Sequence, residues 1–383
     1  MKLAFQLAFR NLKGAGLRTL LNAGALSFAF VIIIFFNGLM DGWNEQAKRD
    51  SIAWQYGYGH VTHEDYDIFD PFTILDAHGV YEHSENLEPL LIRQATIYPD
   101  NRMVGVMVKG ISQDQQILDI PTKYLKNDGP EIPMLIGKNM AESNKLNVGD
   151  QLMLRWRDAY GSFDAGMAEV VQIFETNVPS TDAGQIWIPI ERLWEMTALD
   201  SHATYYIANE HYVHQDADKW VYQDQDALLE EISEMIEMKK YSAGIMYILL
   251  MAIALLAIFD TQVFSIFRRQ REIGTYIALG MTRPQVVGLF TVEGSVYSIA
   301  GVALGALYGF PLFYILSRTG IPLPMDYSDF GIAIAQRIFP VFGLQLVLVT
   351  IILVVISATI VSFIPARKIS KMDPVLALKG KLQ

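Results

Sequence analysis

The sequence of 383 residues contains no cysteine. This absence excludes structural disulfides, a thiolate metal site, a cysteine nucleophile and a lipid attached to a cysteine of the chain. A Walker A loop is also missing, because Gly137-Lys138 is followed by Asn139 rather than by Ser or Thr. The motifs of zinc proteases and of the Gly-x-Ser-x-Gly elbow are absent too. We therefore expect no catalytic residue, and no metal or cofactor bound by this chain.

The seven histidines all lie between residues 43 and 240. Residues 59–63 have the composition of a β-strand, in which residues three apart point to opposite faces. His60 and His63 therefore do not converge as a ligand pair, and we expect hydrogen-bonded or solvated histidines. The alternative is a metal site that also draws on Glu64, His211 and His214.

Long apolar segments are abundant, in contrast, and cover residues 20–40, 243–267, 286–316 and 339–364. Each meets the length of roughly 20 apolar residues with which a helix crosses about 30 Å of hydrocarbon. Uninterrupted apolar runs do not fit the alternating pattern of a membrane β-barrel. The sequence predicts an integral membrane protein. The first segment lacks a small-residue cleavage site, so we expect it to be retained rather than removed as a signal peptide.

Charge is distributed very unevenly along the chain. Residues 43–240 carry 34 Asp and Glu against 15 Lys and Arg. Basic residues instead cluster at both ends and in the loop 268–285, and short loops rich in Lys and Arg stay cytoplasmic. We therefore expect both termini and this loop in the cytoplasm of a bacterium, with residues 43–240 on the periplasmic side of its inner membrane.

The pattern predicts an α+β membrane protein with four transmembrane helices and a large mixed α/β extracytoplasmic domain between the first and second. In that domain, strand-like runs occupy 59–63, 95–99, 103–111, 150–156, 168–174 and 185–190, and short helices 138–145 and 190–197. A helix-spaced segment, 224–240, leads into the second span. The expected domains are an amphipathic interfacial helix (1–17), transmembrane helix 1 (18–42), the extracytoplasmic domain (43–240), transmembrane helix 2 with a cytoplasmic extension (241–279), a coupling helix (280–289), transmembrane helix 3 (290–317), a short periplasmic loop (318–338), transmembrane helix 4 (339–365) and a cytoplasmic tail (366–383).

The loop after the second span has the features of a docking element. We expect the second helix to continue to Leu279, with Gly280 as its C-terminal stop. Thr282 can cap a new short helix that accepts Pro284 in its first turn. A helix held across the cytoplasmic face of the membrane suits docking into a groove on a soluble partner. The alternative is a simple connector.

In this region the sequence resembles the ABC-transporter permease family that includes the macrolide-exporter type, the cell-division permease and the lipoprotein-releasing permeases. The resemblance extends to the chain's opening (Arg10-Asn11-Leu12) and closing (Asp373-Pro374-Val375) segments. Asp260 stands where the family usually has asparagine, and Arg268 where it often has an acidic residue. The matching residues of the central part are Arg269, Arg271, Glu272, Ile273, Gly274, Ala278, Leu279, Gly280, Thr282, Arg283, Glu293, Gly301, Gly305 and Gly309.

The resemblance implies a non-catalytic permease subunit, driven by a separate cytoplasmic ABC ATPase dimer that binds ATP and Mg. It also implies a second permease subunit, lipoprotein cargo and a periplasmic carrier chaperone, although the loop 158–167 is short for direct chaperone capture. The alternatives are an efflux permease of a tripartite pump, and a non-transporting transducer that activates a cell-wall hydrolase. The expected ATPase-coupling residues are Arg271, Glu272, Gly280, Thr282, Arg283, Pro284, Gln285 and Val286.

Three further groups of membrane residues are candidates. Gly301, Gly305 and Gly309 share one helix face and predict close packing against a neighbouring helix. Asp260 and Glu293 are ionisable and therefore costly in a bilayer, so we expect each to pair with a basic residue, with proton relay as the alternative. A hydrophobic cavity for acyl chains is one interpretation of the flexible and aromatic side chains at the outer ends of the first two spans, and ordinary lipid-facing residues are the alternative. These residues are Phe35, Phe36, Asn37, Met40, Tyr241, Met246 and Leu250.

Overall fold

The computed structural model describes residues 17–68, 70–126, 129–215, 217–322 and 337–371. The chain divides into two compact units. The helical unit comprises Met1–Trp43, Ile236–Ile321 and Phe339–Gln383, and the β-rich unit comprises Asn44–Met235 and Pro322–Ile338. The predicted interfacial helix 1–17, most of the loop 318–338 and the closing motif 373–375 lie outside the described residues.

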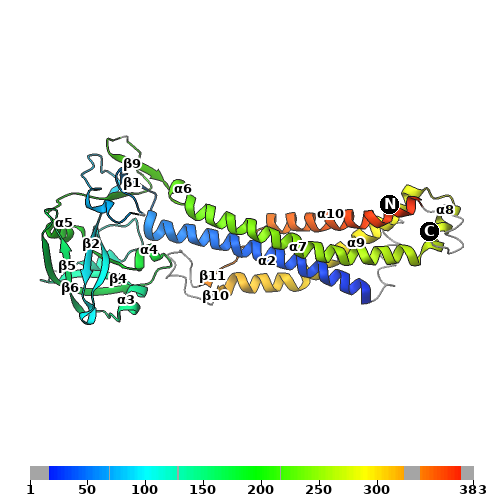
Figure 1. Ribbon diagram of the computed structural model, residues 1–383, viewed down its shortest axis with the longest axis horizontal. Coiled ribbons are helices and arrows are strands. Elements are labelled where there is room, and N and C mark those ends of the chain that lie inside the picture. Colours follow the sequence, from blue (N-terminus) through cyan, green and yellow to red (C-terminus); the bar gives the residue numbers. More distant parts are fainter. Residues whose placement is uncertain (1–16, 69, 127–128, 216, 323–336, 372–383) are drawn as a thin grey trace. The chain divides into compact units, whose positions relative to one another are not determined.

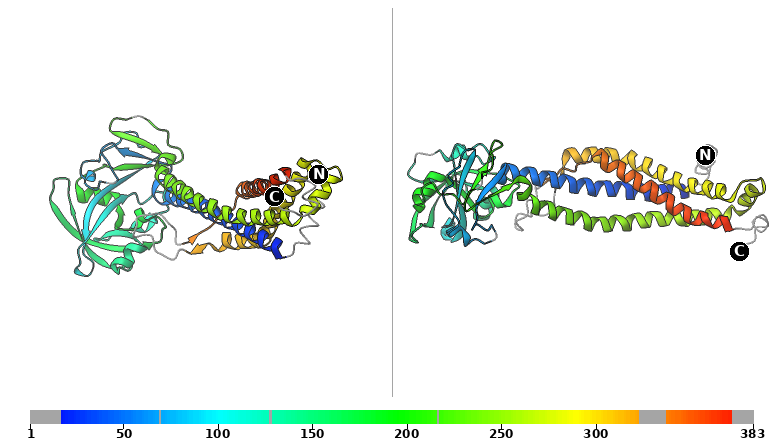
Figure 2. Two further views of the ribbon diagram at one scale, coloured as in Figure 1. Left: turned by 45° about the vertical axis from the view of Figure 1, so that its right-hand side comes forward. Right: turned by 90° about the horizontal axis from the view of Figure 1, so that it is seen from above.

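The helical unit contains four helices that are long and apolar enough to cross a membrane. Figure 2 shows them running side by side. Their apolar surfaces face outward along much of their length, which suits a lipid environment better than water. The long helices are α2 (Leu17–Ser51), α7 (Glu230–Arg268), α9 (Arg283–Thr319) and α10 (Leu344–Ala366), followed by a 3₁₀ helix (Arg367–Lys371), with the short α8 (Gln270–Ala278) between α7 and α9.

Close packing within this unit occurs along the glycines of α9. A Cβ atom added at Gly305 would lie 2.8 Å from Cδ1 of Phe30, and one at Gly301 would lie 2.8 Å from Cβ of Leu26. Gly309 lies against Val31 in the same way. The three glycines therefore form a seam between α9 and α2, where the missing side chains permit close approach of the helices.

Polar side chains also join the helices. Nδ2 of Asn22 on α2 donates to Oγ1 of Thr261 on α7 at 2.8 Å. Between the other two long helices, the hydroxyls of Ser295 on α9 and Thr359 on α10 lie 2.9 Å apart. In a bilayer such bonds favour a defined helix register, because lipid offers no alternative partner.

Two helix boundaries differ from those expected. Instead of one helix over 241–279, α7 ends at Arg268 and α8 begins at Gln270, because Arg269 leaves helical geometry with φ −105° and ψ 19°. Instead of a separate coupling helix before the third span, α9 is one continuous helix from Arg283. Pro284 stands in its first turn, where proline is tolerated, and the helix also continues through Pro311 to Thr319.

The β-rich unit is built on nine strands in the order β3-β7-β4-β6-β5-β2-β8-β1-β9, and β3 also pairs with β2 (Figure 1). This second pairing closes six strands, from β2 to β7, into a barrel. The strands are β1 (Gly59–His63), β2 (Leu87–Ile97), β3 (Val104–Ile111), β4 (Ile132–Gly137), β5 (Gln151–Arg157), β6 (Phe163–Phe174), β7 (Gln185–Pro189), β8 (Tyr205–Ala208) and β9 (Trp220–Asp224).

Short helices fill the connections of the β-rich unit. The predicted helices 138–145 and 190–197 correspond to α3 (Lys138–Asn144) and α5 (Ile190–Thr197). The described part of the chain thus has mixed α and β content beside four apolar helices. The remaining elements are a π-helix (Ile52–Tyr56), 3₁₀ helices (Thr73–Leu75, Pro99–Asn101 and Thr122–Leu125), α4 (Pro179–Asp182), α6 (Gln225–Leu228) and the two-residue strands β10 (Ile321–Pro322) and β11 (Arg337–Ile338).

The barrel is filled by apolar side chains. Strand β5 alternates strictly between exposed and buried residues, with Leu152, Leu154 and Trp156 turned inward. This alternation is the expected pattern of a strand with one face on the core and the other in water. Burial of Leu91, Val108, Met134 and Ile186 from neighbouring strands completes the core.

Candidate coupling surface at the turn from α7 to α9

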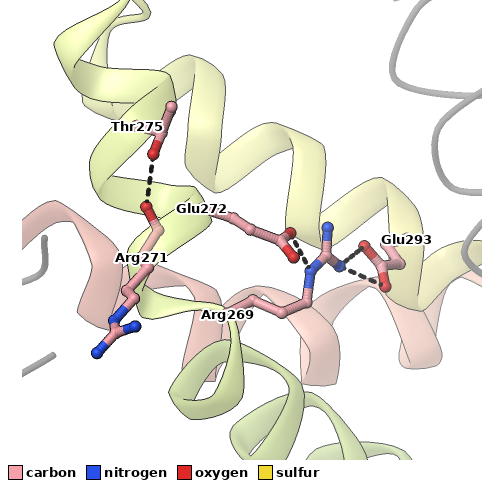
Figure 3. Close-up of polar contacts among 5 residues, drawn as sticks. All are labelled: Arg269, Arg271, Glu272, Thr275 and Glu293. Atoms are coloured by element: carbon pink, nitrogen blue, oxygen red, sulfur yellow. Dashed lines mark hydrogen bonds and ion pairs between the residues drawn. The ribbon is translucent and has the colours of Figure 1, made fainter.

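Arg269 is the centre of the turn that joins α7, α8 and α9. Its Nη1 donates to both carboxylate oxygens of Glu293, at 3.1 and 2.9 Å, and its Nε donates to Oε2 of Glu272 at 2.7 Å (Figure 3). The guanidinium also lies 4.9 Å from the ring centroid of Phe290. Glu293 is 5% exposed, so its charge depends on this partner. The ion pair fixes the end of α7 to α9.

An apolar cluster holds α8 in place beside this ion pair. Ile273 of α8 is fully buried against Val286 and Phe290 of α9. Ile266 of α7 and Ile369, just after α10, complete the same cluster. α8 is therefore packed on three other segments of the helical unit, and the turn is a rigid structure rather than a free loop.

The start of α9 is defined by local capping. Gly280 has φ +98°, a conformation that favours glycine, and it allows the chain to reverse after α8. The backbone N–H of Thr282 donates to Oε1 of Gln285 at 2.9 Å, and the Thr282 side chain caps the helix in return. This capping box, followed by proline in the first turn, fixes the first residues of α9.

The outer side of the turn is exposed. Arg271 and Thr275 on α8, Leu279 at its end, and Arg283 and Pro284 on α9 all face solvent, and Leu279 is 80% exposed. The exposed side of the turn thus combines one large apolar side chain with the two arginines Arg271 and Arg283.

The expected coupling residues divide into three groups in the structure. Arg271, Gly280, Arg283 and Pro284 lie on the exposed side. The side chains of Glu272, Thr282 and Gln285 are exposed but take part in the local bonds described above. Val286 is fully buried in the apolar cluster, so it supports the turn and does not contact a partner. The support given by Arg269 and Phe290 was not expected, although the proximity of a basic loop to Glu293 was a signal for it.

The two intramembrane acids have different surroundings. Glu293 pairs with Arg269, as described. Asp260 is exposed on α7, beside a cavity of about 340 Å³ that Asn22, Thr261 and Phe264 also line. Pairing of Asp260 with a basic residue stays a prediction.

The residues expected to line an acyl-chain cavity are spread over α2 and α7. Tyr241 and Met246 are 77% and 58% exposed on the surface of α7. Phe35 packs edge-on against Phe36 at a centroid distance of 5.3 Å. Asn37 donates to the backbone of its own helix, and Met40 and Leu250 are half-buried.

Comparison with known proteins finds similarity over part of the chain. Residues 244–374 match the model of the family described as FtsX-like permease C-terminal. The macrolide export ATP-binding/permease protein MacB of Shewanella oneidensis is 25% identical over 123 residues, which are 32% of this chain and 16% of the relative. The lipoprotein-releasing system transmembrane protein LolC of Xylella fastidiosa is 26% identical over 151 residues, 38% of this chain and 36% of the relative.

Proposed function

Since the chain is an ABC permease of the MacB, FtsX and LolC type, we propose that a separate ATPase drives it through the exposed side of the α8–α9 turn. The observation that carries this proposal is the rigidity of the turn: Arg269 holds α7 to α9, and Leu279 stands exposed at its tip. A force applied to such a surface is passed to the helices rather than absorbed by a loop.

The proposed orientation follows from the charges. Basic residues flank the helices at the α8–α9 turn and at both ends of the chain, and the β-rich unit is acidic. By the positive-inside rule the turn is cytoplasmic, where ATP is present, and the β-rich unit is periplasmic. The protein would then lie in the bacterial inner membrane.

Movement would be transmitted along α7. This helix runs for 39 residues from Glu230 to Arg268 and includes both a charged first part and an apolar span. The charged part belongs to the sequence that leads out of the β-rich unit. Closure of an ATPase dimer would tilt α7 and α9 together, and the two positions of the helices would form the bistable element that the ATPase biases.

Lipoprotein extraction is the cargo reaction that we propose, on the basis of the LolC relative. Each methylene buried in the membrane contributes about 0.8 kcal/mol, so a triacylated protein does not leave the bilayer spontaneously. A second permease subunit, identical or related, would complete the complex. Efflux of a small molecule is the second candidate, because the MacB relatives are named for macrolide export.

Two exposed residues of the turn allow a direct test. We expect Arg271→Glu together with Leu279→Asp to reduce co-purification of the bacterium's own ABC ATPase to about a tenth or less, because interface energy concentrates in few residues. Arg318→Glu, an exposed arginine near the other end of α9, is the matched control. Unchanged ATPase binding by the double variant, with normal membrane insertion, would exclude docking at this surface.

Cargo is tested separately. The complex is purified in mild detergent and its bound species are identified by mass spectrometry. Triacylated protein is the expected result for lipoprotein extraction, whereas a small apolar compound without acylated protein would favour efflux.

A further inference from the structure

A large groove lies on the β-rich unit, and none of its lining residues belongs to the coupling surface. It has a volume of about 1190 Å³ and runs over strands β2, β3 and β5. The chain segment 71–78 and the turn 158–161 form its sides. A cavity of this size accommodates a ligand well beyond the size of an ion or a single amino acid.

Apolar side chains line much of this groove. Phe72, Met103 and Phe163 are 73%, 74% and 65% exposed, although they belong to a water-facing domain. Trp156, which is almost buried, closes part of the inner wall. Exposed apolar groups gathered in one concave surface favour a ligand with an apolar body.

A buried cation at the groove has an incomplete set of partners. Arg93 is 6% exposed and lines the groove. Its Nη1 donates to the carbonyl oxygens of Ile74 and Leu75, at 2.7 and 3.4 Å, but its Nε is buried with no hydrogen-bond partner. Burial lowers the pKa of Arg93 to about 10. A buried guanidinium with an unused N–H is costly, so an oxyanion that reaches Arg93 would gain a charge-assisted hydrogen bond.

Two further arginines add positive charge at the same place. The guanidinium carbons of Arg155 and Arg157 lie 4.3 and 6.0 Å from the ring centroid of Phe163. The nearby carboxylate of Asp158 is occupied by the backbone N–H groups of Tyr160 and Ser162. The carboxylate of Asp76 also lines the groove, and its charge raises the pKa of Arg93 against the larger effect of burial. With three arginines against the two carboxylates of Asp76 and Asp158, the groove is still an apolar site with a positive balance in a strongly acidic part of the chain.

We propose that this groove binds an anionic amphiphile, with its carboxylate or phosphate on Arg93 and its apolar body along Phe72, Met103 and Phe163. This site goes beyond transport coupling and does not depend on it, because none of its residues belongs to the turn that an ATPase would contact. It gives the β-rich unit a ligand-binding role of its own.

Photo-crosslinking of the full-length protein in lipid nanodiscs tests the site. The probes are diazirine derivatives of octanoate and octyl phosphate, with diazirine derivatives of octyltrimethylammonium and octanol as charge controls. We expect both anionic probes to label peptides that contain Phe72, Met103 or Phe163, and the controls to label them at least about tenfold less, since a charge-assisted bond distinguishes them. The stronger of the two anionic probes identifies the head group. Equal labelling by all four probes would overturn the proposal.

Variants test the role of the charge. Met103→Glu places a negative charge at the groove on an exposed residue, and we expect it to weaken labelling by both anionic probes about tenfold. Val148→Glu, a change at another exposed residue in the turn before β5, is the control and should have no effect. Arg93→Gln should abolish labelling. Thermal unfolding of Arg93→Gln is measured in parallel. If this variant does not fold, the labelling of Met103→Glu decides whether the groove binds the anionic probes.

A peptide ligand is the remaining possibility to exclude. An acidic octapeptide is added as a competitor to the octanoate probe. We expect no displacement at a concentration at which unlabelled octanoate displaces half of the probe. If the peptide displaces the probe at a lower concentration than octanoate does, the ligand of the groove is a protein segment rather than an amphiphile, and the proposal is overturned.

Discussion

At the scale of single residues, the Arg269–Glu293 ion pair shows how a buried charge determines local backbone geometry. Glu293 is nearly inaccessible and is held by both of its oxygens. Arg269 reaches it from the one position between α7 and α8 where the backbone is not helical. The bidentate contact compensates for the loss of solvent around both groups and for the interruption of the helix.

Removal of one partner should therefore be costly. We expect Glu293→Ala to lower the free energy of unfolding by about 3 to 5 kcal/mol, because it removes the buried partner of Arg269 and leaves it with only the exposed carboxylate of Glu272. Glu272→Ala removes the exposed partner of the same arginine, and we expect a loss of no more than about 1 kcal/mol. Thermal unfolding of the purified protein in detergent measures both. Equal losses in the two variants would contradict the central role of Glu293.

His60 gives a prediction for pH. Burial, with a smaller contribution from the charge of Lys109, lowers the pKa of His60 from 6.5 to about 4. Its Nε2 donates to the carbonyl oxygen of Gln55 at 3.1 Å, and its ring stacks on Tyr205 at 4.5 Å. Below pH 6.5 the unfolded chain binds a proton that the folded protein does not. The stability that neutral His60 contributes should thus be fully present above pH 6.5 and fall by about 3 kcal/mol as the pH approaches 4.

The measurement is the unfolding midpoint of the β-rich unit in the full-length protein between pH 7.5 and 4. His60→Gln keeps a donor for Gln55 but does not titrate, so its pH dependence should be flatter than that of the parent protein. The exposed His211→Gln serves as the control. If the two variants show the same pH dependence, His60 is not the responsible group.

Part of this residue-level picture could be predicted from the sequence. Glu293 in an apolar segment predicts a basic partner, and the loop after the second span supplies several arginines. The choice of Arg269 could not be predicted, because it depends on a helix break that this same contact stabilises. Arg93 was not a candidate either, since a lone arginine in a strand has no sequence pattern that indicates burial.

At the scale of secondary-structure elements, the glycines of α9 determine how closely it approaches α2. We expect Gly305→Ala to destabilise the helical unit by about 1 to 3 kcal/mol, because its Cβ would overlap Phe30 and crowd the carbonyl oxygen of Ser27. Gly288→Ala is a matched control on the same helix, since no atom lies within 4 Å of its added Cβ. That change should be neutral or stabilising by up to about 1 kcal/mol, because alanine favours helix. Thermal unfolding in detergent measures both changes. A similar destabilisation by the two would argue against close packing of α9 on α2 at Gly305.

Element prediction succeeded where the local pattern was strong. The predicted helix 190–197 coincides with α5, and β1 and β3 lie where alternating or β-branched residues indicated strands. Strand β4 was missed because Pro133 argues against a central strand. The short β8 was missed too, because its four residues are all buried and carry no alternation. Strand β4 depends on its partners in the closed barrel, and β8 depends on its pairing with β2 and β1 beside the barrel; a local pattern reveals neither.

At the scale of the whole molecule, the absence of cysteine permits a simple test of orientation. We expect Leu279→Cys, on the α8–α9 turn, to react with a membrane-impermeant maleimide only after the inner membrane is opened. Val148→Cys, in the β-rich unit, should react in intact spheroplasts. Both side chains are highly exposed and the parent protein gives no background labelling. The opposite order of labelling would reverse the proposed topology.

The non-helical residue between α7 and α8 has one more consequence. α9 continues without a break from the turn into its apolar span, so Arg269 is the described joint at which α7 could rotate independently of α9. If the Arg269–Glu293 ion pair is lost, an attached ATPase would still be able to close, but its movement would bend the chain at Arg269 instead of tilting α7. Such a complex would show futile hydrolysis: undiminished turnover of nucleotide, with no work done on the transported molecule.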